Sequence, residues 1–157
     1  MRLFMFNLGL AIVWQAVSGS FSLGGLLAGF IVGYGVLWIA HPLFGGSPYF
    51  RKLWRIIGFF FYFVKEMVIA SLRVAYDVVT PLIHARPGIV RVPIEARTDL
   101  EITLLANLIN LTPGSVTIDV SPDRDCLYIH AMFIDDPDEF RAAIKHGIER
   151  RLLELMR

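Results

Sequence analysis

Residues 59–77 read FFFYFVKEMVIASLRVAYD, a run that is apolar enough for lipid but is interrupted by charges. A Lys-Glu pair occupies positions 65 and 66, and Arg73 and Asp77 follow. The chain before this run is almost uncharged, and the chain after it is polar. The placement of this run therefore decides the fold, because it joins a membrane-like half to a water-like half.

The charges around this run gather on one side of a helix. Steps of 100° per residue from Arg51 to Asp77 place all of them within an arc of about 140°. Apart from Ser71, apolar side chains and glycine fill the rest of the surface. The charged face consists of Arg51, Lys52, Arg55, Lys65, Glu66, Arg73 and Asp77. This pattern predicts one strongly amphipathic helix, about 40 Å long.

The residues between Arg2 and Arg51 include no Asp, Glu, Lys or Arg. The run SGSFS at 18–22 breaks this stretch into apolar helices expected at 3–17 and 21–40. These helices reach about 23 Å and about 30 Å, and a bilayer core is about 30 Å thick. We therefore predict a transmembrane helical hairpin of two spans. A cleavable signal peptide is the alternative, which we disfavour because no A-x-A-like site precedes a polar chain.

The amphipathic helix has two candidate placements. It lies in the membrane interface with its charges toward water, or it crosses as a third transmembrane helix with its charges against protein. The basic flanks are Arg2, the group Arg51, Lys52 and Arg55, and the group Arg86, Arg91 and Arg97. Two spans and an interfacial helix place all three flanks in the cytoplasm, whereas a third span places one outside. We favour the interfacial helix, and the spanning helix stays the alternative.

Glycines recur every four residues in the second apolar segment, at Gly25, Gly29 and Gly33. Small residues at this spacing form a flat stripe where helix backbones approach closely in lipid. The stripe predicts a packing face for the first span or for a neighbouring protein.

The polar half predicts a small α+β domain over 85–157. Strands are expected at 88–96, 115–121 and 126–134 from alternating patterns, the last two as a β-hairpin. Thr98 and Glu101 form a capping box that begins a helix, and the turn Thr112, Pro113 and Gly114 ends it. A last helix starts at Asp136 and Pro137, with an apolar face of Phe140, Ala143, Ile144, Gly147 and Ile148. The order β-α-β-β-α is most of a ferredoxin-like unit.

The sequence offers little for chemistry. Lone Cys126 excludes an internal disulfide and a cysteine zinc site, and no calcium loop, phosphate loop or hydrolase motif occurs. Scattered basic residues argue against nucleic acid. We expect no enzyme, no cofactor, no metal and no directly bound small-molecule substrate.

The runs LLANLINLTPGS, DVS and YIHA, with the closing FRAAIKHGIERRLLEL, carry a family resemblance. The chain resembles the E subunit of the Mrp-type (Mnh or Pha) multisubunit Na⁺/H⁺ antiporters over nearly its whole length. The resemblance implies an accessory subunit in a bacterial inner (cell) membrane, multi-pass, in a hetero-oligomer exchanging Na⁺, or K⁺ or Li⁺, for H⁺. It implies no catalytic residue of this chain.

Three parts are thus expected: a hairpin over 1–41, a connecting loop and amphipathic helix over 42–84, and a cytoplasmic domain over 85–157. The partners expected are the other antiporter subunits and membrane lipid. Two other functions stay open, a membrane-anchored regulatory domain that binds a small ligand and a small transporter that oligomerises through its glycine stripe.

Overall fold

The computed structural model describes residues 2–19, 21–40, 49–81 and 85–157. Its contacts divide the chain into two compact units, Met1–Arg55 and Ile56–Arg157. Residues 42–48 of the predicted connecting loop lie outside the described residues. The three-part division predicted above stays a prediction.

The first unit contains a helical hairpin of α1 (Arg2–Ser18) and α2 (Leu23–Ile39). Gly19 takes a φ of 67°, which glycine adopts without a side-chain clash. The Ser22 hydroxyl accepts a hydrogen bond from the Gly25 N–H at 3.0 Å and caps α2. Both predicted helices are confirmed as helices, and α2 has 17 residues rather than 20. No helix in the described ranges combines the length and the apolar character needed to cross a membrane.

The amphipathic segment forms a single helix, α3 (Tyr49–Val79), of 31 residues. Its length is about 46 Å at 1.5 Å per residue. The predicted helix over 51–77 is confirmed. At its start, the Phe50 ring packs edge-on against Tyr34 of α2, with 5.1 Å between ring centroids.

The polar half folds around a three-stranded sheet of β1 (Gly88–Pro93), β2 (Ser115–Val120) and β3 (Cys126–Ala131). The strand order is β1-β3-β2, and β3 is antiparallel to both neighbours. The predicted hairpin of β2 and β3 is confirmed, with Arg124 at φ 57° in its turn. Because β3 lies between β1 and β2, the arrangement is the split unit expected of a ferredoxin-like fold.

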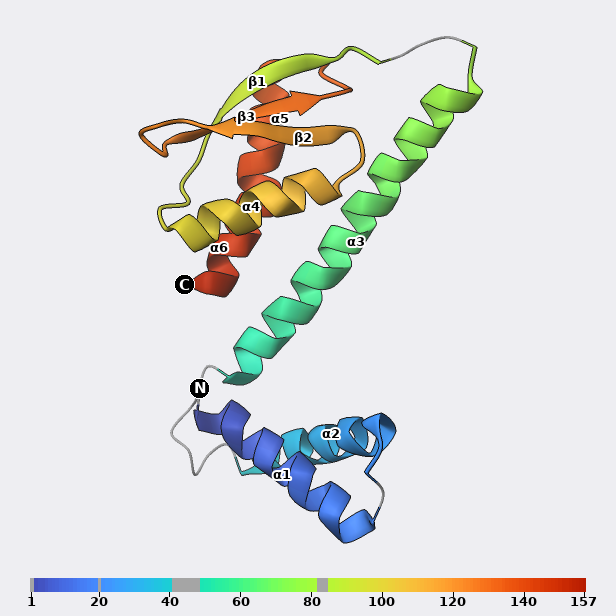
Figure 1. The fold of residues 1–157 in the computed structure, drawn as a ribbon, viewed down its shortest axis with the longest axis vertical. Helices are drawn as coiled ribbons and strands as arrows, with labels where there is room; N and C mark the ends of the chain where they lie inside the picture. Colours follow the sequence, from blue (N-terminus) through green and yellow to red (C-terminus); the bar gives the residue numbers. More distant parts are fainter. Residues whose placement is uncertain (1, 20, 41–48, 82–84) are drawn as a thin grey trace. The chain divides into compact units, whose positions relative to one another are not determined.

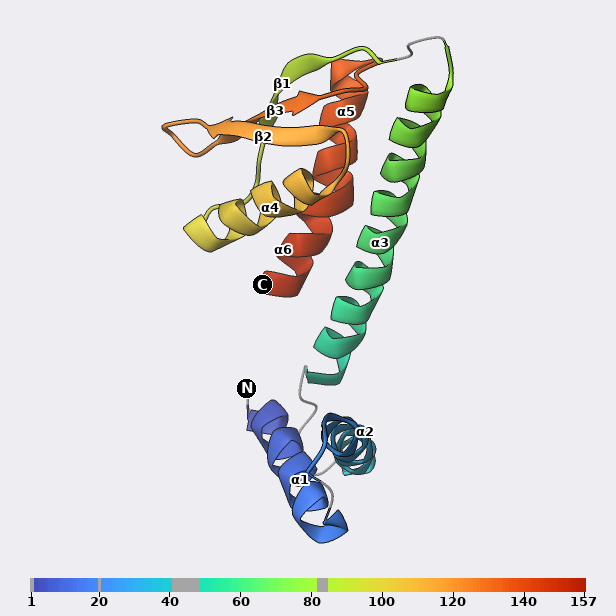
Figure 2. The same ribbon diagram turned by 45° about the vertical axis from the view of Figure 1, so that its right-hand side comes forward.

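Helices cover one face of this sheet (Figures 1 and 2). They are α4 (Asp99–Leu111), α5 (Pro137–Ala143), the π-helical turn η2 (Ile144–Glu149) and α6 (Arg150–Met156). Leu105 and Ile109 of α4 meet Leu127 and Ile129 of β3 in a fully buried core. The predicted order β-α-β-β-α is therefore confirmed.

The last helix differs from prediction in its interior. A single α-helix with Ala143 on its apolar face was expected, but Ala143 is exposed and η2 interrupts the helix. A π-turn bonds residue i to i+5 and takes up more residues per turn, so it rotates the residues that face the core. The predictions for Ile144 and Ile148 hold, since both are buried.

Local polar contacts protect the open edges of the sheet. The Arg141 Nε donates to the Arg91 carbonyl on β1 at 2.9 Å, and the Asn110 Oδ1 accepts from the Thr117 N–H on β2 at 2.7 Å. A bulge also shifts the β2 register between Thr117 and Asp119. These features disfavour pairing with a further strand.

Candidate functional site: the seam between α3 and the α+β domain

The charged face of α3 points toward the α+β domain along the second half of the helix. The seven predicted residues are exposed at Arg51, Lys52, Arg55, Lys65 and Arg73, half-buried at Glu66 and buried at Asp77. Contacts between this face and the domain define a seam that runs from Tyr62 to Val74. We treat the seam as the candidate functional site, because it sets which side of α3 is left uncovered.

In the first contact of the seam, Tyr62 of α3 packs against Gly147 of η2 and Arg151 of α6. The Arg151 guanidinium lies over the Tyr62 ring, 4.1 Å from its centroid. A Cβ at Gly147 would lie 2.7 Å from the Tyr62 hydroxyl oxygen. A larger residue at position 147 would therefore require the Tyr62 hydroxyl to shift.

The second contact of the seam centres on Arg73. Its Nη2 donates to Asp135 Oδ2 at 3.1 Å, and its guanidinium lies 4.5 Å from the Phe133 ring centroid. Arg86 adds a longer contact to Asp135 at 3.8 Å. Because Arg73 and Asp135 are more than half exposed, the ion pair adds little stability.

The predicted turn of Thr112, Pro113 and Gly114 lies at this seam. Gly114 has a φ of 86°, and its carbonyl accepts from the Met132 N–H at 2.7 Å. A Cβ at Gly114 would lie 3.5 Å from Val74 Cγ2 of α3. The turn thus joins α4 to β2 and also touches α3.

The structure brings two sets of predicted residues together at a shallow hollow of about 240 Å³. Glu66 and Arg73 line it from α3, and Thr112–Gly114 line it from the domain. Sites for small ligands usually measure roughly 300–1,000 Å³. The hollow therefore gives no support to the ligand-binding alternative. Within the described residues, no group of three or more His, Cys, Asp or Glu side chains is placed to hold a metal ion.

The glycine stripe packs α2 against α1. A Cβ at Gly29 would lie 2.8 Å from Trp14 Cβ and 2.9 Å from the Ala11 carbonyl oxygen. A Cβ at Gly33 would lie 2.5 Å from Asn7 Oδ1. Gly25 is half-buried, and its N–H serves the cap of α2. Gly29 and Gly33 therefore face the first helix of the same chain.

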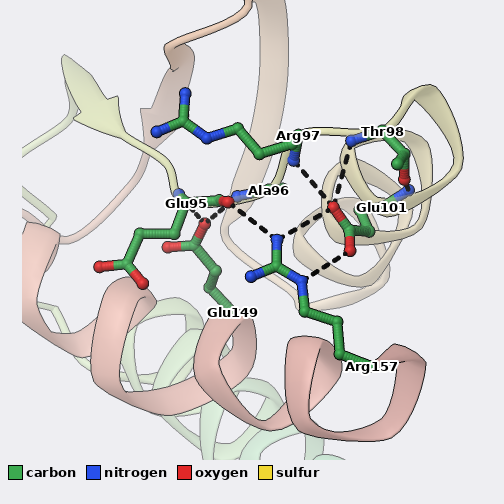
Figure 3. A network of polar contacts seen from close by, with 7 residues as sticks. All are labelled: Glu95, Ala96, Arg97, Thr98, Glu101, Glu149 and Arg157. Carbon is green, nitrogen blue, oxygen red and sulfur yellow. Dashed lines mark hydrogen bonds and ion pairs between the residues drawn. The ribbon is translucent and has the colours of Figure 1, made fainter.

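A polar network ties the loop after β1 to the last helix (Figure 3). The Glu101 carboxylate accepts from the Arg97 and Thr98 N–H groups at 2.8 and 3.1 Å, and from Arg157 Nε at 3.1 Å. The Arg157 guanidinium and these two amides lower the pKa of Glu101 to about 2. Because the side chain is only 5% exposed, its charge depends on these donors.

Glu149 of η2 is the other carboxylate in this network. Its Oε1 accepts from the Glu95 and Ala96 N–H groups, whereas its Oε2 has no hydrogen-bond partner in the part of the chain that is described. The side chain is 1% exposed, and burial raises its pKa. Both carboxylates hold backbone together, and neither opens onto the hollow.

Apolar side chains remain exposed on the hairpin and on α3, and some are also exposed on the domain, such as Ile89 and Leu100. On the hairpin, Val17, Ile31 and Ile39 are 82%, 69% and 77% exposed. On α3, a strip opposite the seam is exposed at Phe60, Phe61, Val68, Leu72, Val78 and Val79. We name these six residues the apolar strip. Patches of this kind mark contact with a partner or with lipid.

Comparison with known proteins gives a family match along almost the whole chain, covering the hairpin, α3 and the α+β domain. The family described as Na⁺/H⁺ ion antiporter subunit matches residues 7–155. A protein of Bacillus subtilis, named as the E subunit of a Na⁺/H⁺ antiporter, is 38% identical over 98% of this chain and 97% of its own length. This chain belongs to the family of Na⁺/H⁺ antiporter E subunits.

Further relatives are consistent with this membership. The Na⁺/H⁺ antiporter E subunit of Alkalihalophilus pseudofirmus is 34% identical over 96% of each chain. A chain in the structure of the Mrp complex from Dietzia sp. is 34% identical, with a TM-score of 0.51 over 66% of this chain and 96% of that one. A chain of the membrane-bound sulfane sulfur reductase, an archaeal respiratory membrane complex, is 26% identical, with a TM-score of 0.57 over 96% of each chain.

Sequence reasoning missed several residues of the seam and the network of this family member. The capping pattern identified Glu101, but nothing local signals its pairing with Arg157, 56 residues away. Glu149 was missed because η2 turns it inward, and a regular helical pattern does not predict that turn. Cys126 is fully buried, and its Sγ accepts a hydrogen bond from Arg91 Nε at 3.1 Å.

Proposed function

We propose that this protein is an accessory, non-catalytic membrane subunit of a multisubunit monovalent cation/proton antiporter. One observation carries the proposal: residues 3–39 contain no Asp, Glu, Lys or Arg. Ion and proton paths through membranes use ionisable side chains in the spanning segments. The hairpin therefore packs against subunits that transport, and its role is to support their assembly and activity.

The α1–α2 hairpin lies in the bilayer in this proposal. Its outward side chains are apolar, as the exposures of Val17, Ile31 and Ile39 illustrate. Trp14 and Trp38 are exposed near the C-terminal ends of α1 and α2. Because the two helices are antiparallel, the two tryptophans lie toward opposite faces of the membrane. Tryptophan favours the interfaces of a bilayer, which suits this placement. The positive flanks support a cytoplasmic α+β domain.

The partners are the other subunits of an Mrp-type complex in a bacterial cell membrane. The names of the relatives support Na⁺ as the transported ion, exchanged for H⁺. The exposed apolar side chains of the hairpin support a hetero-oligomer, because glycine packing on α1 leaves the outer surfaces of both helices for neighbours.

The test is affinity purification of the tagged full chain from its own membranes in mild detergent, with mass-spectrometric identification of the bound subunits. We expect several very hydrophobic antiporter subunits, and we expect Na⁺/H⁺ exchange to fail in membranes that lack this chain. The untagged strain is the control for carry-over.

A second measurement separates support from transport. The pure chain, reconstituted alone into sealed vesicles, is expected to show no Na⁺-driven proton movement. Exchange that is lost on substitution of a hairpin residue would overturn the non-catalytic role. Purification without any partner would overturn the role in a complex.

A further inference from the structure

We propose that α3 lies along the surface of the phospholipid bilayer, with its apolar strip among the acyl chains and the α+β domain on its aqueous side. The sequence left a third membrane span open. This inference rests on the proposed function only for the membrane residence of the hairpin, and it goes on to assign a lipid-binding surface to α3.

The first argument is the reach of the seam along α3. The domain touches α3 from Tyr62 to Val74, a distance of about 18 Å along the axis. Charged groups of the domain lie in these contacts, including Arg151 at Tyr62 and Asp135 at Arg73. A spanning α3 would place these groups in hydrocarbon, where unsolvated charges are very costly.

The length of α3 outside the seam leads to the same conclusion. Thirteen residues of α3 precede Tyr62, which gives about 20 Å of helix, and a span needs about 30 Å. The part after Val74 is shorter still. With the domain in place, neither end of α3 is long enough to cross the bilayer.

The second argument is the position of the apolar strip. At 100° per residue, its six members fall within an arc of about 120° that holds no charged side chain. Tyr62 and Arg73 of the seam lie within about 20° of each other on the opposite side of α3. The exposed fractions of the strip run from 48% at Val68 to 78% at Val79. The domain and the strip therefore occupy opposite sides of one helix.

The third argument identifies lipid as the occupant. Trp54, Lys65 and Tyr76 are spaced by eleven residues, which is a drift of only about 20° per step, so they form a line beside the strip. Trp54 and Tyr76 are 67% and 60% exposed, and Lys65 is exposed. Tryptophan, tyrosine and lysine settle at headgroup depth, with their apolar parts toward the acyl chains.

The charge of the first half of α3 also favours lipid. Residues 49–65 carry Arg51, Lys52, Arg55 and Lys65 and no Asp or Glu. All four basic side chains are exposed. Anionic headgroups attract such a group, whereas the core of a protein interface is depleted of lysine.

The experiment measures the depth of single cysteine labels in the assembled complex, reconstituted into vesicles that contain phosphatidylglycerol. Cys126 is replaced by Ser, and a fluorescent label is placed at Leu72→Cys on the strip. Lipids with a spin label near the headgroup or near the chain end quench it from two depths. Ile31→Cys on the hairpin is the membrane control, and Asp123→Cys on the domain surface is the aqueous control.

We expect the label at 72 to be quenched more by the shallow spin label than by the deep one. Val68→Cys repeats the measurement, so that a fault at one position does not decide it. Stronger deep quenching at 72 would show a spanning helix, and protection from both lipid and water would show a protein partner. Either result overturns the inference. Loss of lipid quenching at position 31 would instead contradict the membrane hairpin of the proposed function.

Discussion

The hairpin of α1 and α2 and the α+β domain bury apolar side chains to very different extents. The domain closes a core of thirteen buried residues, and Leu105, Leu127 and Ile129 are fully inaccessible. In the unit that contains the hairpin, the buried cluster consists of Leu3, Leu37 and Phe50. Most large side chains of the hairpin point outward instead.

The difference is the one expected from the proposed placements, with the domain in water and the hairpin in lipid. The domain interlocks side chains between a sheet and helices, which is the arrangement that water favours. The hairpin brings backbones together at Gly29 and Gly33, the contact by which helices associate where water supplies no driving force. A region of the first kind has its own core, whereas a region of the second kind leaves most of its apolar side chains exposed, as the proposed membrane placement of the hairpin expects.

The same substitution in both regions gives the largest expected contrast. We expect Leu105→Ala to destabilise the domain by about 2–5 kcal/mol, because it leaves a cavity in a closed core. Leu27→Ala on the hairpin should change the stability of the full chain little in detergent, because Leu27 is 57% exposed. Hydrogen exchange of domain and hairpin amides in mild detergent measures both. Equal losses would contradict the comparison.

The second test separates the two kinds of packing. We expect Gly29→Leu to cost about 1–3 kcal/mol or more, because the added bulk meets the Trp14 side chain and the Ala11 backbone. Recovery of the assembled complex should fall as α1 and α2 separate. Gly35→Leu is the matched control, since nothing lies within 4 Å of a Cβ there. Equal recovery of both variants in co-purification would mean that the stripe does not hold the hairpin together.

The parts of the fold that were predictable are those that neighbouring residues determine. The capping box at Thr98 and Glu101 and the turn at Gly114 follow from short patterns, as does α3, which extends two residues beyond its predicted range at each end. The charged face of α3 was also predictable, but the part of the chain that packs against it was not. Tyr62 meets Arg151, 89 positions along the chain, and one sequence carries no signal for such a pairing. The turn η2 was missed because its side chains resemble those of an ordinary helix.

The pH dependence of the domain sharpens the comparison further, because the Glu101 and Glu149 network has no counterpart among the charge-free residues 3–39. The pKa of Glu101 lies at about 2, below its ordinary value of 4.5. Its stabilisation is therefore complete above pH 4.5 and is lost as the pH falls through about 2. Glu149 has the opposite sign: burial raises its pKa, so its contribution weakens as the pH rises from 4.5 through that raised value.

Glu101→Gln and Glu149→Gln form a matched pair for this test. Glu101→Gln should reduce the loss of unfolding free energy of the domain as the pH falls below 4.5. Glu149→Gln should reduce the loss of that free energy as the pH rises above 4.5. Urea unfolding of the full chain in detergent, followed by circular dichroism over a pH series, measures both. An unchanged loss below pH 4.5 in Glu101→Gln would mean that its bonds to Arg157 and the two amides do not stabilise the fold.

The smallest effect expected is the loss of one cap in the domain. The Thr98 Oγ1 accepts a single hydrogen bond, from the Glu101 N–H at 3.2 Å, so Thr98→Ala should cost about 1 kcal/mol. Thr103→Ala, at an exposed position inside α4, removes the same atoms without a cap and should be neutral or slightly stabilising, because alanine is the better helix former. Urea unfolding of the two variants measures the difference. Because the domain has a closed core of its own, we expect the cost of Thr98→Ala to be the same in the free chain and in the assembled complex. A cost that appears only in the free chain would mean that partner subunits hold α4 in place, and that the domain depends on its neighbours as is proposed for the hairpin.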